Sequence, residues 1–172
     1  MLGAQAKRLA AARRVFKLMF QEDAPSNRSI EQLRGIEGSK VRELYGALAR
    51  KNGIQWHGRD QKKALDDPLN RAISGANAAL YGVTEAIVLA LGYSPAIGFV
   101  HSGDPRSFVF DVADTIKFKT VIPLAMELYA NGAIKNESDI RTKCRDLFKD
   151  KDLTRWIVEN ISGILGHHKI DG

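Results

Sequence analysis

The strongest constraint on the fold of this chain is an apolar stripe over residues 68–91. Apolar residues recur there at steps of three and four, which is the spacing along one face of an α-helix. The stripe consists of Leu69, Ile73, Ala76, Leu80, Val83, Ile87 and Leu91. Asp67 stands where an N-cap is expected, Pro68 occupies the first turn, and Gly92 ends the run. The segment therefore predicts a long helix with one buried face.

The rest of the chain shows the same period in shorter segments. An apolar stripe from Leu9 to Met19 predicts an N-terminal helix, and a second helix starts at Ser29, where Gln32 completes a capping box. Further helices are predicted over residues 107–118, 122–130, 139–149 and 152–165. Residues 96–100 are apolar and fit either a helical turn or a brief extended segment. Because almost every segment has the helical period, the sequence predicts an all-α fold.

Composition narrows the class of protein. The formal net charge of +6 favours a polyanionic partner, because Lys and Arg gain affinity by releasing counterions from phosphates. The single cysteine, Cys144, excludes an intramolecular disulfide and a thiolate zinc site, and its helical spacing predicts a core position. We find no apolar run long enough to span a bilayer and no secretory signal, so we expect a cytoplasmic protein without a membrane partner.

Glu37 is a carboxylate in line with an apolar stripe. It lies four residues after Leu33 and four before Val41, so it points along the face that is predicted to be buried. A carboxylate there is costly unless it is paired, protonated or bound to a metal. Two interpretations stay open: a metal ligand, or a glutamate at the helix rim paired with Arg34 or Lys40.

Three further polar residues are candidates for a site. His101 follows a short apolar segment and fits either a hydrogen-bonded structural histidine or a metal ligand. Asp111 and Asp114 are three apart on a predicted helix, so they share a face and repel each other unless a cation or proton intervenes. The alternative for them is an exposed pair neutralised by Lys117. With Glu37 these residues offer oxygen and nitrogen ligands that suit Mg²⁺ or Mn²⁺, although spacing alone does not bring them together.

Three segments carry a family resemblance. They are residues 34–39, residues 79–85 and the long run over residues 92–123. In order and near-family spacing they resemble the CRISPR-associated integrase, in particular the branch found in type I-E systems, and the likeness extends from Ser29 to about Phe148. The resemblance implies the helical catalytic domain of a metal-dependent DNA endonuclease that inserts new spacers into CRISPR arrays.

The resemblance also implies roles for individual residues. It makes Glu37, His101 and Asp114 the ligands of Mg²⁺ or Mn²⁺, with Asp111 as an acidic neighbour that supports the site. Tyr81 would lie close to the scissile DNA. These five are the implied catalytic residues. The implied DNA-binding residues are Arg34, Lys117 and Arg59, the last in a polar loop over residues 54–67.

The implied reaction is a transesterification, in which a DNA 3′-hydroxyl attacks a phosphodiester at the boundary of a repeat. Its implied partners are prespacer and repeat DNA, including branched intermediates. In the family a homodimer of this protein also pairs with a small ferredoxin-like CRISPR-associated protein.

The resemblance has one large departure. Members of the family carry a β-rich N-terminal domain, and this chain starts at its threshold. We therefore expect a truncated product or an expressed fragment, a single helical catalytic domain over residues 1–172. It would comprise an N-terminal helix and linker (1–28), a metal-site core (29–150) and a C-terminal helix and tail (151–172). The alternatives are a truncated, catalytically silent module that binds DNA or a partner, and a plain helical scaffold, which does not explain Glu37.

Overall fold

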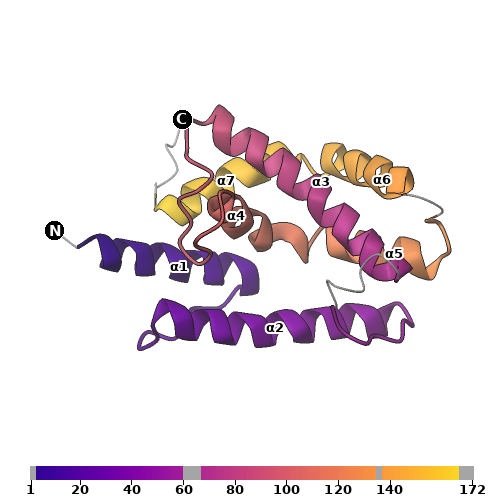
Figure 1. The fold of residues 1–172 in the computed structure, drawn as a ribbon, viewed down its shortest axis with the longest axis horizontal. Coiled ribbons are helices and arrows are strands. Elements are labelled where there is room, and N and C mark those ends of the chain that lie inside the picture. Colours follow the sequence, from indigo (N-terminus) through magenta and orange to yellow (C-terminus); the bar gives the residue numbers. More distant parts are fainter. Residues whose placement is uncertain (1–2, 60–66, 135–136, 167–172) are drawn as a thin grey trace.

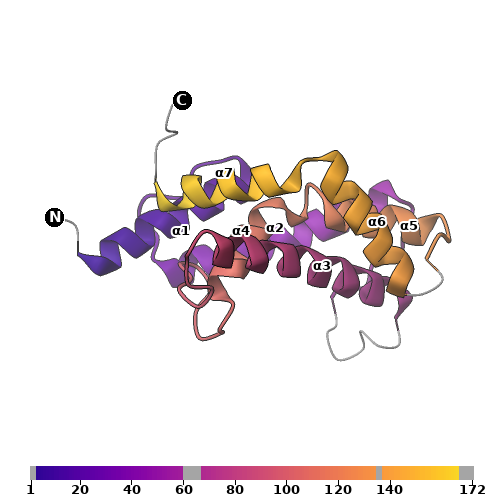
Figure 2. The same cartoon turned by 90° about the horizontal axis from the view of Figure 1, so that it is seen from above.

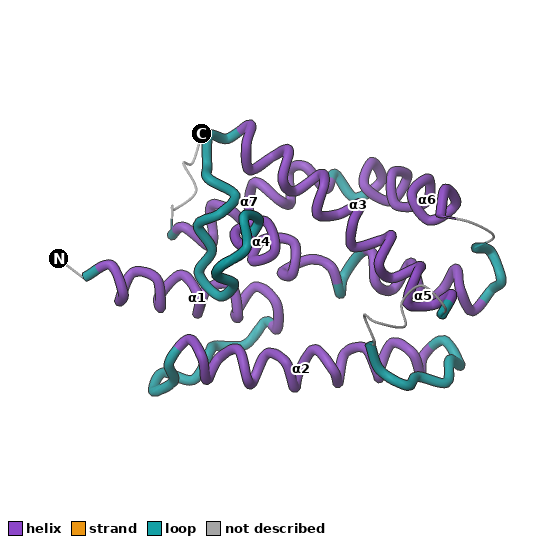
Figure 3. The backbone as a smooth tube through the Cα atoms, viewed as in Figure 1, coloured by secondary structure: helices purple, strands orange, loops and turns teal. Residues whose placement is uncertain are grey.

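The computed structural model describes residues 3–59, 67–134 and 137–166 and confirms the all-α fold, with seven helices and no strand in those residues (Figure 1). The helices are α1 (Ala4–Phe20), α2 (Ile30–Lys51), α3 (Pro68–Ala90), α4 (Ser107–Lys117), α5 (Val121–Ala130), α6 (Glu137–Asp150) and α7 (Leu153–Leu165). A long loop separates α3 from α4, as the tube in Figure 3 shows.

The helix termini form where their capping residues predict. At the start of α2 the Ser29 hydroxyl accepts a hydrogen bond from the Gln32 backbone N–H, and the Gln32 side chain accepts one from the Ser29 N–H. At the start of α3 the Asp67 carboxylate accepts a hydrogen bond of 2.9 Å from the Leu69 N–H. Each cap satisfies a backbone N–H that has no partner within the helix, so these starts are determined locally.

The core is assembled around α3 and α4. Helix α3 contacts α4, α5, α6 and α7, and α4 also packs against α1 and α7 (Figure 2). Ten of the eleven residues of α4 are buried, because helices surround it on several sides. Helix α2 lies along the lower side in Figure 1, where it contacts α1 and α5. Polar side chains on α4 are therefore forced into the interior, where they need partners.

The predicted elements differ from the observed ones in detail. The segment over residues 96–100 is neither helix nor strand but part of the loop between α3 and α4. Of the polar loop over residues 54–67, residues 60–66 lie outside the described part of the chain, as do residues 167–172 of the predicted tail. Cys144 is buried, as its spacing predicts.

Helix α3 corrects the expectation that no apolar run in this chain is long enough to span a bilayer. By length and composition alone this helix of 23 residues, which contains an 18-residue window with a mean hydropathy of 1.3, is long and apolar enough to cross a membrane. Its apolar residues instead form the centre of the core: Leu69, Ile73, Ala76 and Leu80 are each at most 3% exposed. The apolar composition of α3 is therefore that of a core helix, which other helices cover.

Candidate metal centre

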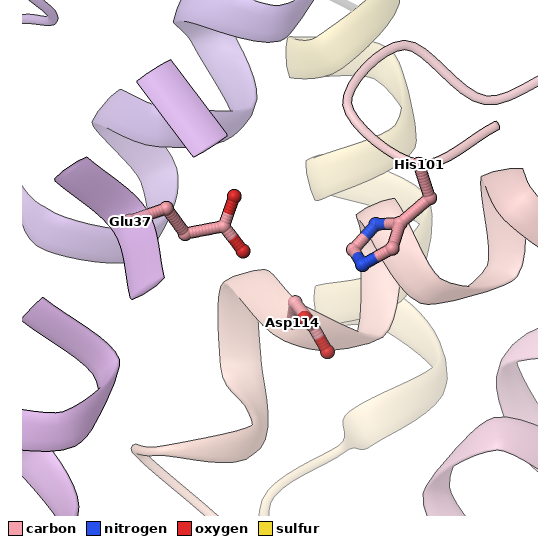
Figure 4. A group of neighbouring side chains, drawn as sticks. All are labelled: Glu37, His101 and Asp114. Carbon is pink, nitrogen blue, oxygen red and sulfur yellow. The ribbon is translucent and has the colours of Figure 1, made fainter. Parts of the chain in front are cut away.

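Glu37, His101 and Asp114 converge from three separate elements (Figure 4). Glu37 lies on α2, His101 on the loop before α4, and Asp114 on α4. One ligand atom of each lies within 4.8 Å of the others. The three residues singled out in the sequence thus meet in space, and their oxygen and nitrogen donors are those that suit Mg²⁺ or Mn²⁺.

Asp111 holds the loop that carries His101. Its side chain is fully buried, and it accepts hydrogen bonds from the backbone N–H groups of Phe99, Val100 and His101. It also lies 2.8 Å from His101 Nδ1. A histidine whose Nδ1–H donates to a carboxylate presents the lone pair of Nε2 on its other side, which is the arrangement found at metal-binding histidines.

Two other contacts determine the shape of this loop. A Cβ atom on Gly98 would lie 2.5 Å from the His101 carbonyl oxygen and 2.7 Å from the Ser107 Cβ, so only glycine fits there. The Arg8 side chain on α1 donates a hydrogen bond of 3.1 Å to the Phe99 carbonyl. The loop is thus tied to α1 as well as to α4.

Asp114 is paired with Lys117 inside the protein. The Lys117 ammonium lies 2.8 Å from the Asp114 carboxylate, and both residues are buried. Burial by itself lowers the pKa of Lys117, but the charge of Asp114 and the phenols of Tyr81 and Tyr45 raise it by more, so the ammonium stays charged. The alternative of an exposed pair is wrong in its exposure, because Asp111 and Asp114 are both buried. Lys117 does pair with Asp114, whereas Asp111 contacts the half-buried His101.

Tyr81 lies beside these charges. Its ring packs edge-to-face against Phe110 with the ring centroids 5.0 Å apart. Burial and the charge of Asp114 raise the pKa of Tyr81 to about 12. The side chain is therefore a neutral hydroxyl at physiological pH, able to donate a hydrogen bond.

Glu37 has neither of the ion pairs that the rim interpretation requires. Lys40 pairs with Glu22 at 2.7 Å, and Arg34 is exposed on the same helix. Burial raises the pKa of Glu37, and the charge of Asp114 raises it further. For His101, burial lowers the pKa, but the hydrogen bond with Asp111 and the charge of Asp114 raise it overall. Both shifts favour protonated forms, which reduce the repulsion among the carboxylates when no cation is bound.

The raised pKa of Glu37 makes stability depend on pH. Because the folded state binds this proton more tightly than the unfolded state, its stabilisation is fully present below the unfolded pKa of about 4.3 and is lost as the pH rises through the folded pKa. In EDTA we expect Glu37→Gln to raise the melting temperature relative to wild type by an amount that grows from pH 4 to pH 8. Glu43→Gln, an exposed position on the same helix, is the control. A difference that stays constant over this pH range would contradict the prediction.

A cleft of about 570 Å³ adjoins this cluster, because Lys117, which pairs with Asp114, is one of the residues that line it. Its aromatic and cationic lining consists of Tyr45, Arg59, Tyr81, Arg106 and Lys117. Arg59 is held in place by hydrogen bonds of 3.1 Å to the Asn70 carbonyl and 3.3 Å to the Ser74 hydroxyl. Arg34 lies outside the residues that line this cleft.

Sequence reasoning missed two of the lining residues. Tyr45 is buried on α2, where its ring stacks on Trp56 with the centroids 5.4 Å apart. A polar aromatic side chain in an apolar stripe was a weak signal for it. Arg106 lies over the Phe110 ring, 5.2 Å from its centroid, inside the segment over residues 92–123 that carries the resemblance.

Comparisons with known proteins identify the family of this chain. The sequence model of the family described as CRISPR associated protein Cas1 matches residues 3–161. The chain is 46% identical over 168 residues to the CRISPR-associated endonuclease Cas1 of Escherichia coli K12, covering 95% of this chain and 54% of that protein. It is 44% identical over 168 residues to the one of Geobacter sulfurreducens, covering 95% of this chain and 55% of that protein.

Solved structures resemble the fold as well. The crystal structure of TtCas1 has a TM-score of 0.79 at 33% identity, over 96% of this chain and 62% of that one. The crystal structure of a TtCas1–DNA complex has a TM-score of 0.80 at 32% identity, over 95% of this chain and 60% of that one. The chain spans about half the length of the curated relatives that it matches. The match over nearly all of its length shows that this chain belongs to the CRISPR-associated Cas1 endonuclease family.

Proposed function

We propose that this chain carries the catalytic centre of a divalent-metal-dependent DNA endonuclease and integrase that acts in CRISPR spacer acquisition. The observation that carries the proposal is the convergence of Glu37, His101 and Asp114 within 4.8 Å. Family membership supports an endonuclease; the metal dependence, the transesterification, the Mg²⁺ or Mn²⁺ cofactor and a cytoplasmic location are parts of the proposal.

The donor set of this site fits a divalent cation. Two carboxylates and one imidazole are hard and intermediate ligands of the kind that Mg²⁺ and Mn²⁺ accept. Two acidic groups at this distance repel, and the pKa of Glu37 is raised first by burial and then by the charge of Asp114. A divalent cation would relieve it, whereas a plain helical scaffold would gain nothing from placing both carboxylates here.

The side chains of this centre would divide the work of phosphoryl transfer. Glu37, Asp114 and the Nε2 atom of His101 would hold the cation, and Asp111 would fix the tautomer of His101 through the 2.8 Å contact with Nδ1. When bound, the cation would neutralise charge on the phosphate and stabilise the attacking and leaving oxygens. A DNA 3′-hydroxyl would form the new bond to phosphorus as the bond to the leaving 3′-oxygen breaks.

The adjoining cleft supports DNA as the substrate. The Lys117 ammonium keeps its charge and would contact a phosphate, and the neutral Tyr81 hydroxyl would donate a hydrogen bond near the reacting group. Arg59, in the loop after α2, adds a cation that hydrogen bonds to α3 hold in place. Arg34, exposed on α2, would contact DNA outside the cleft. One solved relative is a TtCas1–DNA complex, which agrees with a DNA-binding role. A homodimer and a small ferredoxin-like CRISPR-associated partner belong to the same proposal.

Cleavage of a branched, integration-intermediate DNA tests the proposal. We expect the wild-type protein to cleave this DNA in Mn²⁺ but not in EDTA. We expect His101→Ala to lower the cleavage rate by more than about 100-fold. Substitution of a residue that only supports a metal ligand typically lowers metal affinity or activity by about 10–100-fold, so substitution of a ligand should have at least as large an effect. His57→Ala, an exposed histidine in the loop after α2, is the matched control. Cleavage that persists in EDTA, or in a folded His101→Ala variant, would contradict the proposed centre.

The second candidate is a catalytically silent module that binds DNA or a protein partner. It is favoured by one observation, that the cationic side chains of Arg59, Arg106 and Lys117 line the cleft and would attract phosphates whether or not a metal is held. DNA binding that is indifferent to EDTA and to Glu37→Ala, without cleavage by the Mn²⁺-loaded protein, would support this candidate over the first.

A further inference from the structure

A buried amide on α7 lies in the apolar interface of that helix. Asn160 is 7% exposed, and its neighbours along the same helix face, Ile157, Ile161 and Ile164, are each at most 1% exposed. A buried amide is costly unless its hydrogen bonds are made within the protein. Its presence among isoleucines therefore needs a partner.

The partner lies on the helix that carries the two aspartates. Asn160 Nδ2 donates a hydrogen bond of 2.7 Å to the Thr115 hydroxyl, which is 1% exposed. The Thr115 hydroxyl in turn donates one of 2.6 Å to the Val112 carbonyl. Thr115 follows Asp114 and Val112 follows Asp111, so this chain of hydrogen bonds ends in the turn of α4 that holds both carboxylates.

Directional contact at this point restrains the rotation of α4 about its own axis. Apolar side chains pack at a given separation but tolerate small rotations better than a hydrogen bond does. A side-chain atom about 5 Å from a helix axis moves by about 0.9 Å when the helix turns by about 10°. His101 would follow such a turn through Asp111, but Glu37 on α2 would not. A rotation of α4 therefore changes the separation of Asp114 and Glu37 and distorts the ligand set.

We propose that Asn160 is a positioning residue for the metal centre, acting through Thr115 on the rotation of α4; this rests on the proposed metal site at Glu37, His101 and Asp114. Helix α7 thereby takes part in metal binding although none of its side chains belongs to the ligand cluster.

Mn²⁺ affinity of the 172-residue chain, measured from free Mn²⁺ by electron paramagnetic resonance, tests the inference. We expect Thr115→Val, which keeps the side-chain shape, and Asn160→Leu each to weaken Mn²⁺ binding by about 10-fold, the lower end of the effects seen for residues that support metal ligands. The double variant should bind no more weakly than either single one, because both remove the same hydrogen bond. Thr115→Ser, which keeps the hydroxyl, should restore the affinity.

A variant on the same helix separates positioning from stability. Ile157→Val removes a buried methyl group one turn before Asn160, so it should lower the melting temperature and leave Mn²⁺ affinity unchanged. Folded Thr115→Val and Asn160→Leu proteins that bind Mn²⁺ as tightly as wild type would overturn the inference. A wild-type chain that binds no Mn²⁺ would instead overturn the proposed metal centre, so the two failures are distinguishable.

Discussion

Replacing Asp111 with alanine is expected to lower the free energy of unfolding by about 3–5 kcal/mol, which is the usual loss when one partner is removed from a buried charged network. The fully buried carboxylate accepts from three backbone N–H groups and contacts His101 Nδ1. Alanine would leave these donors in the interior without acceptors. For a chain of this size the loss corresponds to a fall in melting temperature of roughly 10 °C.

The measurement is thermal unfolding in EDTA, so that metal binding does not contribute. Asp146→Ala is the matched control, because that carboxylate is half-exposed and pairs with Arg145 on the surface. A surface pair of this kind contributes about 0–1 kcal/mol. If Asp111→Ala melted within a degree of the control, the network around His101 would not hold the loop as described.

Replacing Asp114 with asparagine is expected to lower the Mn²⁺-dependent cleavage rate by more than about 100-fold while the fold is retained. Asparagine keeps an acceptor for Lys117, 2.8 Å from the present carboxylate, and removes a negative charge beside Glu37. A neutral amide is a much weaker ligand for a divalent cation than a carboxylate. Cleavage assays and circular dichroism on the same preparation check both halves of the expectation.

Alanine at position 114 is a harsher change than the sequence suggests. Because Asp111 and Asp114 repel each other, loss of one charge alone predicts an intact fold. In the structure, however, the buried Lys117 ammonium would lose its counter-ion. Lys117→Met in the Asp114→Ala background should therefore recover stability without recovering cleavage. A well-folded Asp114→Asn protein that cleaves at the wild-type rate would refute the role of Asp114 as a ligand.

The helices could be predicted from the sequence because caps and apolar periodicity act over a few residues. The limits of this reasoning appear within α3. Its first half buries the predicted stripe, but in the second half Thr84 and Val88 are fully buried, and Leu91, the C-cap, is 43% exposed. Two apolar rows run side by side along this half, and periodicity alone does not tell which row faces the neighbouring helices. Packing against α4, α5 and α6 makes that choice.

The candidate site was predictable for a different reason. Glu37 conflicts with the apolar stripe around it, and such a conflict between a charge and its surroundings is visible in the sequence. The choice among its partners was not visible there. Lys40 could equally have neutralised Glu37, and it lies instead 2.7 Å from Glu22. The sequence likewise gave no reason to connect Asn160 with Thr115, 45 positions away.

The all-α class and the helix starts at Ser29 and Asp67 follow from the sequence alone. The sequence also identifies the polar residues that stand on faces predicted to be buried. The packing of the helices brings three of them together from α2, the loop before α4 and α4. It also places Asp111 beside His101 and Asp114 beside Lys117. The physical reason is range: capping and periodicity act between residues a few positions apart, whereas the pairing of buried charges depends on which helices pack against each other.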